Sequence, residues 1–194
     1  MMNEMCKGDY PRALEYGLDA FHVNSTTREI TEFLMFVYLH LRDYSTAFTY
    51  LEMSENMDQK GNGHDGLTVL RGYAYLENGM KEEADQQFQQ AIRNTLLEIE
   101  RNTRGAQDND AHYVLAVTYS ILGNNEKAME YLSVLKNGET IDFGMITDLK
   151  LFPGFDAVRA DPNFEAMFND FEAKYLKLHN RVKEMLIQEG VLES

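Results

Sequence analysis

The sequence contains no tryptophan, a single cysteine and only three prolines among 194 residues. The lone thiol, Cys6, excludes an intrachain disulfide framework. No apolar run approaches the roughly 18 residues that a membrane-spanning helix needs, and residues 1–5 lack the charged and apolar regions of a signal peptide. We therefore expect a soluble, cytoplasmic protein, with export left open if a leader has been removed.

Basic residues are also scarce. The chain has 18 Lys and Arg against 32 Asp and Glu, so its formal net charge is −14. A charge of this sign repels polyanions over most of the surface. Nucleic acid and anionic membranes are therefore excluded as expected partners.

The chain does contain one phrase four times, in which a Gly or Arg is followed five residues later by Ala. The phrases begin at Gly8, Arg42, Gly79 and Gly123 and end at Ala13, Ala47, Ala84 and Ala128. These alanines are 34, 37 and 44 residues apart, and a recurrence in this range indicates stacked helical hairpins. The longest interval also predicts that the second helix of the third unit continues two or three turns beyond Ala91.

The third unit carries the clearest motif. Gly72 precedes Tyr75 by three residues, and Ala84 and Phe88 follow on the next helix. This pattern resembles the tetratricopeptide repeat, which has small residues where two antiparallel helices approach closely. The second and fourth units fit the same frame through Tyr38, Ala47, Leu51, Tyr119, Ala128 and Leu132. The resemblance implies an all-α fold, a right-handed α–α superhelix of the tetratricopeptide type.

The repeat pattern is lost from about Gly138. We therefore predict an array of helical hairpins over residues 1–139, whose first hairpin is truncated, and a capping segment over residues 140–194. Residues 151–155 predict a turn between apolar anchors. Asp161 and Pro162 predict the start of a long amphipathic C-terminal helix that caps the array. Residues 159–164 resemble the ending of tetratricopeptide arrays in bacterial regulatory and signalling proteins.

Residues suited to catalysis or metal binding are scattered. The five histidines stand one per element, and none pairs with another at the spacing that puts two metal ligands on one helix face. The loop from Asp58 begins like a calcium loop, but Lys60 and Val69 stand where ligands should be. We therefore expect no catalytic residue, no metal, no cofactor and no enzymatic activity.

The resemblance implies instead a concave groove lined by the first helix of each hairpin, and side-chain direction selects the residues that face it. The predicted partner-binding residues are Glu32, Phe36, Leu39, His40, Val69, Tyr73, Leu76, Tyr113, Val117 and Ser120. This lining is apolar and aromatic at its middle and acidic at its edge, so it suits a protein or peptide with apolar anchors flanked by positive charge. One alternative stays open: some of Phe36, Tyr73 and Tyr113 belong to the core or are covered by the chain's own C-terminal helix.

These patterns predict a protein-interaction module or scaffold. The alternative is an accessory or regulatory domain of a larger enzyme or transcription regulator whose effector domain lies outside this chain. A half-hairpin at the N-terminus exposes an apolar face that a complete array would cover. We therefore also expect a homodimer through this half-hairpin.

Overall fold

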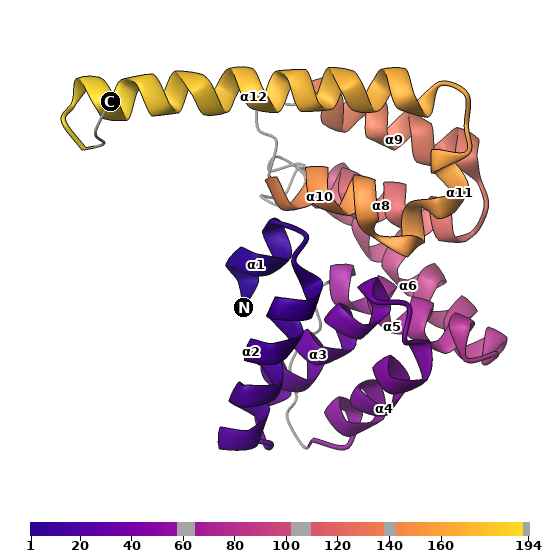
Figure 1. The fold of residues 1–194 in the computed structure, drawn as a ribbon. Helices are drawn as coiled ribbons and strands as arrows, with labels where there is room; N and C mark the ends of the chain where they lie inside the picture. Colours follow the sequence, from indigo (N-terminus) through magenta and orange to yellow (C-terminus); the bar gives the residue numbers. More distant parts are fainter. Residues whose placement is uncertain (58–64, 102–109, 138–142, 192–194) are drawn as a thin grey trace.

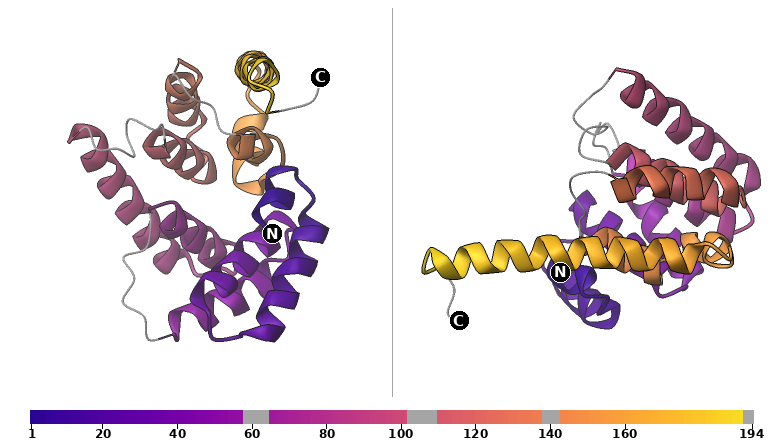
Figure 2. Two further views of the ribbon diagram at one scale, coloured as in Figure 1. Left: turned by 90° about the vertical axis from the view of Figure 1, so that its left-hand side faces the viewer. Right: turned by 90° about the horizontal axis from the view of Figure 1, so that it is seen from above.

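The structure is a computed structural model that describes residues 1–57, 65–101, 110–137 and 143–191, and every regular element in these ranges is helical. The elements are α1 (Met2–Cys6), α2 (Tyr10–Val23), α3 (Arg28–His40), α4 (Tyr44–Glu55), α5 (Asp65–Glu77), α6 (Lys81–Glu100), α8 (Asp110–Ile121), α9 (Asn125–Asn137), α10 (Phe143–Leu151), the 3₁₀ helix η1 (Pro153–Phe155), α11 (Asp156–Arg159) and α12 (Phe164–Gln188). Helices α3 and α4, α5 and α6, and α8 and α9 pack as consecutive hairpins (Figures 1 and 2). The predicted all-α, tetratricopeptide-like superhelix is confirmed.

The four repeated phrases share one turn geometry. Their first residues, Gly8, Arg42, Gly79 and Gly123, have φ angles of 76°, 60°, 81° and 73°. The N–H of the next residue donates to a carbonyl five positions earlier, as from Asp43 to Tyr38 at 3.0 Å. This is the Schellman closure, which favours Gly because it requires a positive φ.

The same phrases also begin the following helices. The side chains of Asp9, Asp43 and Asn124 each accept a hydrogen bond at 3.2 Å from the backbone N–H three residues later. Such N-caps satisfy donors that have no partner inside the helix. Each phrase therefore ends one helix and starts the next within a few residues, which sets the hairpin geometry locally.

Close packing between paired helices explains the small residue in the motif. A Cβ atom added to Gly72 of α5 would lie 2.7 Å from Cε1 of Phe88 on α6. The ring of Phe88 is 1% exposed and has little room to move. Gly72 is therefore required because the aromatic ring of the facing helix occupies the space of its side chain.

Helix α6 has the predicted extra length. It runs for 20 residues and ends at Glu100, so the extension beyond Ala91 is confirmed. The part of the calcium-like loop over residues 58–64 lies outside the described residues. The predicted boundary between residues 139 and 140 also falls outside them.

The long C-terminal helix begins later than predicted. Helix α12 starts at Phe164 rather than at Asp161 and Pro162, and its N-cap, Asn163, makes no side-chain cap. The carboxylate of Asp161 accepts from the Asn163 N–H at 2.8 Å, and the Asp161 carbonyl accepts from the Phe164 N–H at 3.0 Å. These bonds close a separate turn around Pro162, so the carboxylate is used before the helix starts.

The C-terminal part shares the core of the array. Buried side chains from Met35 on α3 to Phe171 on α12 form one continuous hydrophobic cluster. Helix α10 packs against α1, η1 packs against α8, and the first part of α12 packs against α9 and α10. The segment from α10 to α11 therefore lies inside the curve of the array, between its first and last hairpins (Figure 1).

Candidate functional site

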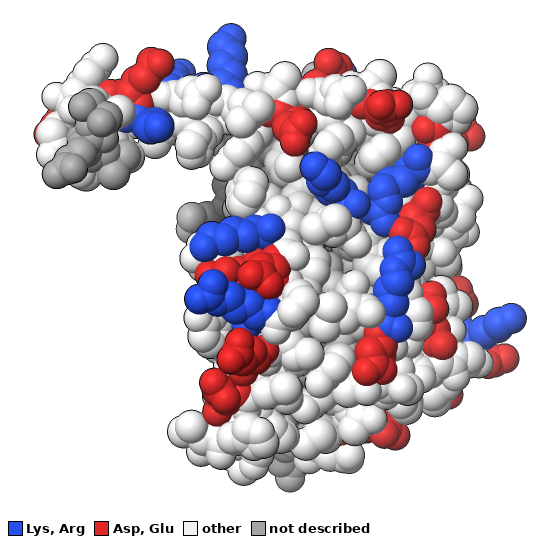
Figure 3. All heavy atoms as spheres, viewed as in Figure 1, with Lys and Arg blue, Asp and Glu red and all other residues white. Residues whose placement is uncertain are grey.

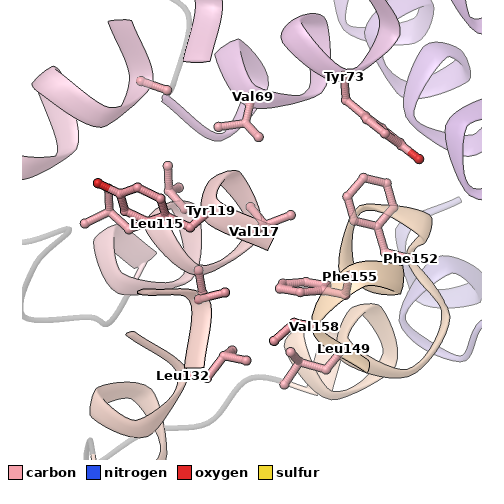
Figure 4. Close-up of a cluster of buried hydrophobic side chains, with 14 of the residues drawn as sticks. Val69, Tyr73, Leu115, Val117, Tyr119, Leu132, Leu149, Phe152, Phe155 and Val158 are labelled. Atoms are coloured by element: carbon pink, nitrogen blue, oxygen red, sulfur yellow. The ribbon is translucent and has the colours of Figure 1, made fainter. Parts of the chain in front are cut away.

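The concave side of the array holds a segment of the same chain. Phe152 is 1% exposed, and its ring centroid lies 4.6 Å from His40, 5.6 Å from Tyr73 and 6.3 Å from Phe36. Phe155 is fully buried, 5.8 Å from the Tyr113 ring. Figure 4 shows Phe152 directed toward Tyr73 and Phe155 toward Val117. The turn predicted over residues 151–155 thus inserts both of its aromatic anchors between the first helices of the hairpins.

None of the predicted groove residues is fully exposed to solvent, since the inserted segment packs against this side of the array. Six of them are buried, namely Leu39, His40, Val69, Tyr73, Val117 and Ser120. The other four, Glu32, Phe36, Leu76 and Tyr113, are half-buried. The alternative left open by the sequence was that some of Phe36, Tyr73 and Tyr113 are core or are covered by the chain's own C-terminal helix. Tyr73 is buried, but Phe152 and Phe155 of the α10–α11 segment pack against these side chains, and α12 does not provide the cover. A role in partner binding stays a prediction for these residues.

A polar network ties α10 to the array. The carboxylate of Asp148 accepts from the Tyr113 hydroxyl at 2.7 Å and lies 3.1 Å from Nε2 of His40. Nδ1 of His40 lies 2.9 Å from the Phe36 carbonyl oxygen. Asp148 therefore connects two of the predicted groove residues, His40 on α3 and Tyr113 on α8.

An ion-pair cluster fastens the other end of the inserted segment. The guanidinium of Arg42 donates to both carboxylate oxygens of Asp156, at 2.7 and 3.0 Å, and Arg159 also pairs with Asp156. Burial acts to raise the pKa of Asp156, but hydrogen bonds from the two arginines outweigh it and hold that pKa below its ordinary value. Arg159 also donates to the carbonyls of Leu149 and Phe152, each at 2.9 Å. Asp156 at the start of α11 is thus bound to Arg42, in the turn between α3 and α4.

One pocket remains open on the α10 side of the inserted segment. It has a volume of about 380 Å³ and is lined by residues of α1, α3, α8 and α10: Met2, Met5, Cys6, Phe36, Asp110, Tyr113, Gly144, Met145 and Asp148. We call it the methionine pocket. Three thioethers and two aromatic rings make most of the wall, and two carboxylates add negative charge.

A second pocket, the tyrosine pocket, lies on the η1 and α11 side. Its volume is about 320 Å³, and its lining includes Tyr44, Tyr73, Leu76, Glu77, Ser120 and Asp156. The Tyr44 and Tyr73 hydroxyls lie 3.3 Å apart, and burial together with this hydrogen bond raises the pKa of Tyr73 well above its usual value. Oγ of Ser120 is buried and has no hydrogen-bond partner among the described residues.

Five of the ten predicted groove residues line one of the two pockets. Phe36 and Tyr113 line the methionine pocket, and Tyr73, Leu76 and Ser120 line the tyrosine pocket. Glu32 lines neither, since its carboxylate pairs with Arg28 at 2.9 Å and Arg71 at 2.8 Å. Leu39, His40, Val69 and Val117 also lie outside both linings.

The sequence analysis missed the residues that the C-terminal segment contributes. Asp148 and Met145 help to form the methionine pocket, and Phe152 fills the space between the pockets. The spacing of Ile146, Leu149 and Phe152 was a signal in the sequence, because apolar residues three apart lie on one face of a helix and need a neighbour to cover them.

Among the described residues, no three His, Cys, Asp or Glu side chains are grouped so that they could hold a metal ion. No helix in the described part of the chain has the length and apolar character needed to cross a bilayer.

Comparison with known proteins agrees with the hairpin architecture. The family model of the tetratricopeptide repeat matches residues 69–94 and 110–133, within the α5–α6 and α8–α9 hairpins. No curated protein and no solved structure matches the sequence significantly. The likeness of the C-terminal tail to bacterial regulatory proteins stays a prediction. The chain thus carries two segments of the tetratricopeptide type within an all-α array of hairpins, a fold that is generally a non-catalytic scaffold for protein–protein interaction.

Proposed function

We propose that the chain is a protein-interaction module whose partner inserts an apolar side chain, with a basic residue beside it, into the methionine pocket. The observation that supports this is the composition of the wall, where Met2, Met5 and Met145 stand beside Phe36 and Tyr113. Methionine side chains are flexible and polarizable, so they adapt to partner side chains of different shape. A pocket of about 380 Å³ is large enough for one such anchor.

The charge of the partner follows from the carboxylates. Asp110 and Asp148 line the pocket, and the whole chain has a net charge of −14. A Lys or Arg next to the apolar anchor is attracted by this field, which also accelerates association. We therefore expect the bound segment to be both apolar and basic.

The inserted segment is part of this site and does not compete with the partner. Gly144, Met145 and Asp148 all belong to α10, so the pocket exists only while α10 is in place. Displacement of the segment would also expose Phe152 and Phe155, which are 1% and 0% exposed. Burial of each such ring contributes about 1.5–3 kcal/mol, so a partner gains more by binding beside the segment than by replacing it.

Selection from a displayed library of random 12-residue peptides tests the proposal. We expect enrichment of sequences in which Lys or Arg neighbours a large apolar residue. Met145→Lys should weaken binding of the selected peptides at least tenfold, because it places a positive charge in the pocket. The control is Met53→Lys on α4, since Met53 is also half-buried but lines neither pocket.

Two results would contradict this function. One is a set of selected peptides without basic residues. The other is equal loss of binding in the Met145 and Met53 variants while both remain folded by circular dichroism. The second candidate function is an accessory or regulatory domain of a larger enzyme or transcription regulator, and it is proposed only from the resemblance of residues 159–164. In that case the methionine pocket would bind its partner in the same way.

A further inference from the structure

The second half of α12 extends away from the rest of the molecule (Figures 1 and 2). Tyr175, which stacks on Phe143 with ring centroids 5.3 Å apart, is the last described residue of α12 that packs against the hydrophobic core. At ~1.5 Å per residue, the following stretch to Gln188 is about 20 Å long. This stretch is a helix without a partner element among the described residues.

Its apolar residues continue the pattern that packs the first half of the helix. The seam of α12 has alternating spacings of four and three residues and consists of Phe164, Phe168, Phe171, Tyr175, Leu178, Val182 and Met185. Phe164 and Phe171 are 7% and 1% exposed, whereas Val182 and Met185 are 51% and 49% exposed. Alternating three and four spacing is the pattern with which one helix packs along another. The seam is therefore occupied in the first half of α12 and open in the second.

The open half differs in charge from the rest of the chain. Residues 176–188 contain three basic residues and one acidic residue, in a protein of net charge −14. Figure 3 shows basic side chains, with acidic ones beside them, along the extended part of α12. The far end lies more than two Debye lengths from the body, since that length is about 8 Å at physiological ionic strength. The acidic body therefore contributes little to the potential at this end.

The charges beside the seam argue against a second copy as the occupant. Arg181 occupies a position that flanks the seam, where charged residues select the pairing partner. In an antiparallel pair of α12 helices, Arg181 would face Arg181 of the other copy. In a parallel pair it would face Leu186. Neither arrangement supplies an attractive charge, whereas acidic residues at the flanking positions of another helix do.

We propose that residues 178–185 of α12 dock an amphipathic helix of a partner protein that carries acidic residues beside its apolar seam. This surface is separate from the methionine pocket in position and opposite to it in charge preference. The chain thus presents two interaction surfaces, one for a basic and one for an acidic partner.

A pair of synthetic helices tests the proposal. Both are labelled three-heptad peptides with Leu along the seam, one with Glu and the other with Lys at the flanking positions. The assay uses the full chain carrying Met145→Lys, so that the methionine pocket does not bind the Lys peptide. Fluorescence anisotropy should then show saturable binding of the Glu peptide and none of the Lys peptide. The double variant Val182→Gln, Met185→Gln should bind the Glu peptide at least tenfold more weakly. Leu176→Gln is the matched control, because Leu176 is equally exposed, at 50%, but lies off the seam.

A charge reversal makes the test decisive. In the same Met145→Lys background, Arg181→Glu should weaken binding of the Glu peptide and introduce binding of the Lys peptide. Equal binding of the two peptides, or equal loss in the seam variant and the Leu176 control, would overturn the proposal. So would stronger binding to vesicles containing phosphatidylserine than to the Glu peptide, which would indicate a lipid surface. A concentration-dependent mass of the chain alone that the seam variant abolishes would indicate a second copy instead.

Discussion

Replacement of Phe152 by Ala should strongly destabilise the protein. The ring is 1% exposed and lies among the side chains of Phe36, His40, Tyr73 and Phe155. Removal of a buried Phe side chain costs about 3–5 kcal/mol, because both the transfer free energy and the contacts around the cavity are lost. Since a typical domain has only about 5–15 kcal/mol of stability, the variant should lose a large part of it.

Urea denaturation followed by far-ultraviolet circular dichroism measures this loss. The control is Phe143→Ala, which removes the same side chain from the same C-terminal segment at a position that is 41% exposed. Phe143 stacks on Tyr175, so we expect this control to cost about 0.5–1.5 kcal/mol. A loss of less than about 1 kcal/mol in Phe152→Ala would refute the reasoning. It would mean that the inserted segment is not part of the cooperative core and can leave the concave side.

Four further predictions concern single contacts. Arg42→Gly should leave the urea midpoint unchanged or raise it, because a non-glycine residue at positive φ costs about 1–2 kcal/mol and an exposed ion pair contributes about 0–1 kcal/mol. Gly72→Ala should destabilise by about 1–3 kcal/mol, since the added methyl group would meet the Phe88 ring. The lowered pKa of Asp156 stabilises the fold at neutral pH, and this contribution is lost as pH falls through the folded-state pKa, so the difference in thermal midpoint between the native chain and Asp156→Asn should shrink on acidification. The homodimer through α1 and α2 predicts a mass in analytical ultracentrifugation that rises with concentration, and a constant monomer mass would contradict it.

The hairpins could be predicted from the sequence because their signals are local. A Gly at positive φ, an Asp or Asn that caps the next helix, and an Ala at the crossing point all fall within a few residues of one another. Arg42 shows the limit of this reasoning. It was recognised by its place in the phrase, but its bond to Asp156 joins residues 114 positions apart and has no counterpart in the other three turns.

The arrangement on the concave side could not be predicted in the same way. The sequence identified the turn at residues 151–155 and its apolar anchors, but where they pack depends on the curvature of the whole array. Asp148 illustrates the difficulty, since its partner His40 lies 108 positions away. An aspartate between Thr147 and Leu149 has no local feature that distinguishes it from a solvated residue.

The start of α12 was misplaced for a related reason. An Asp followed by Pro is typical of a helix start, yet the Asp161 carboxylate closes its own turn three residues earlier. Both outcomes use the same carboxylate and the same kind of backbone donor.

The contact between α1 and α10 has a consequence for how the protein folds. The Thr147 hydroxyl donates to the Cys6 carbonyl at 2.5 Å, across 141 positions of the chain. In an open array each hairpin touches only its neighbours, so the ends can unravel one unit at a time. Here α1 and α10 contact each other, so residues 6 to 147 form one long loop. Contacts between residues this far apart in sequence slow folding. We therefore expect the chain to unfold in one cooperative transition, without the stepwise fraying of an open solenoid. We also expect it to fold more slowly than an open solenoid of the same length.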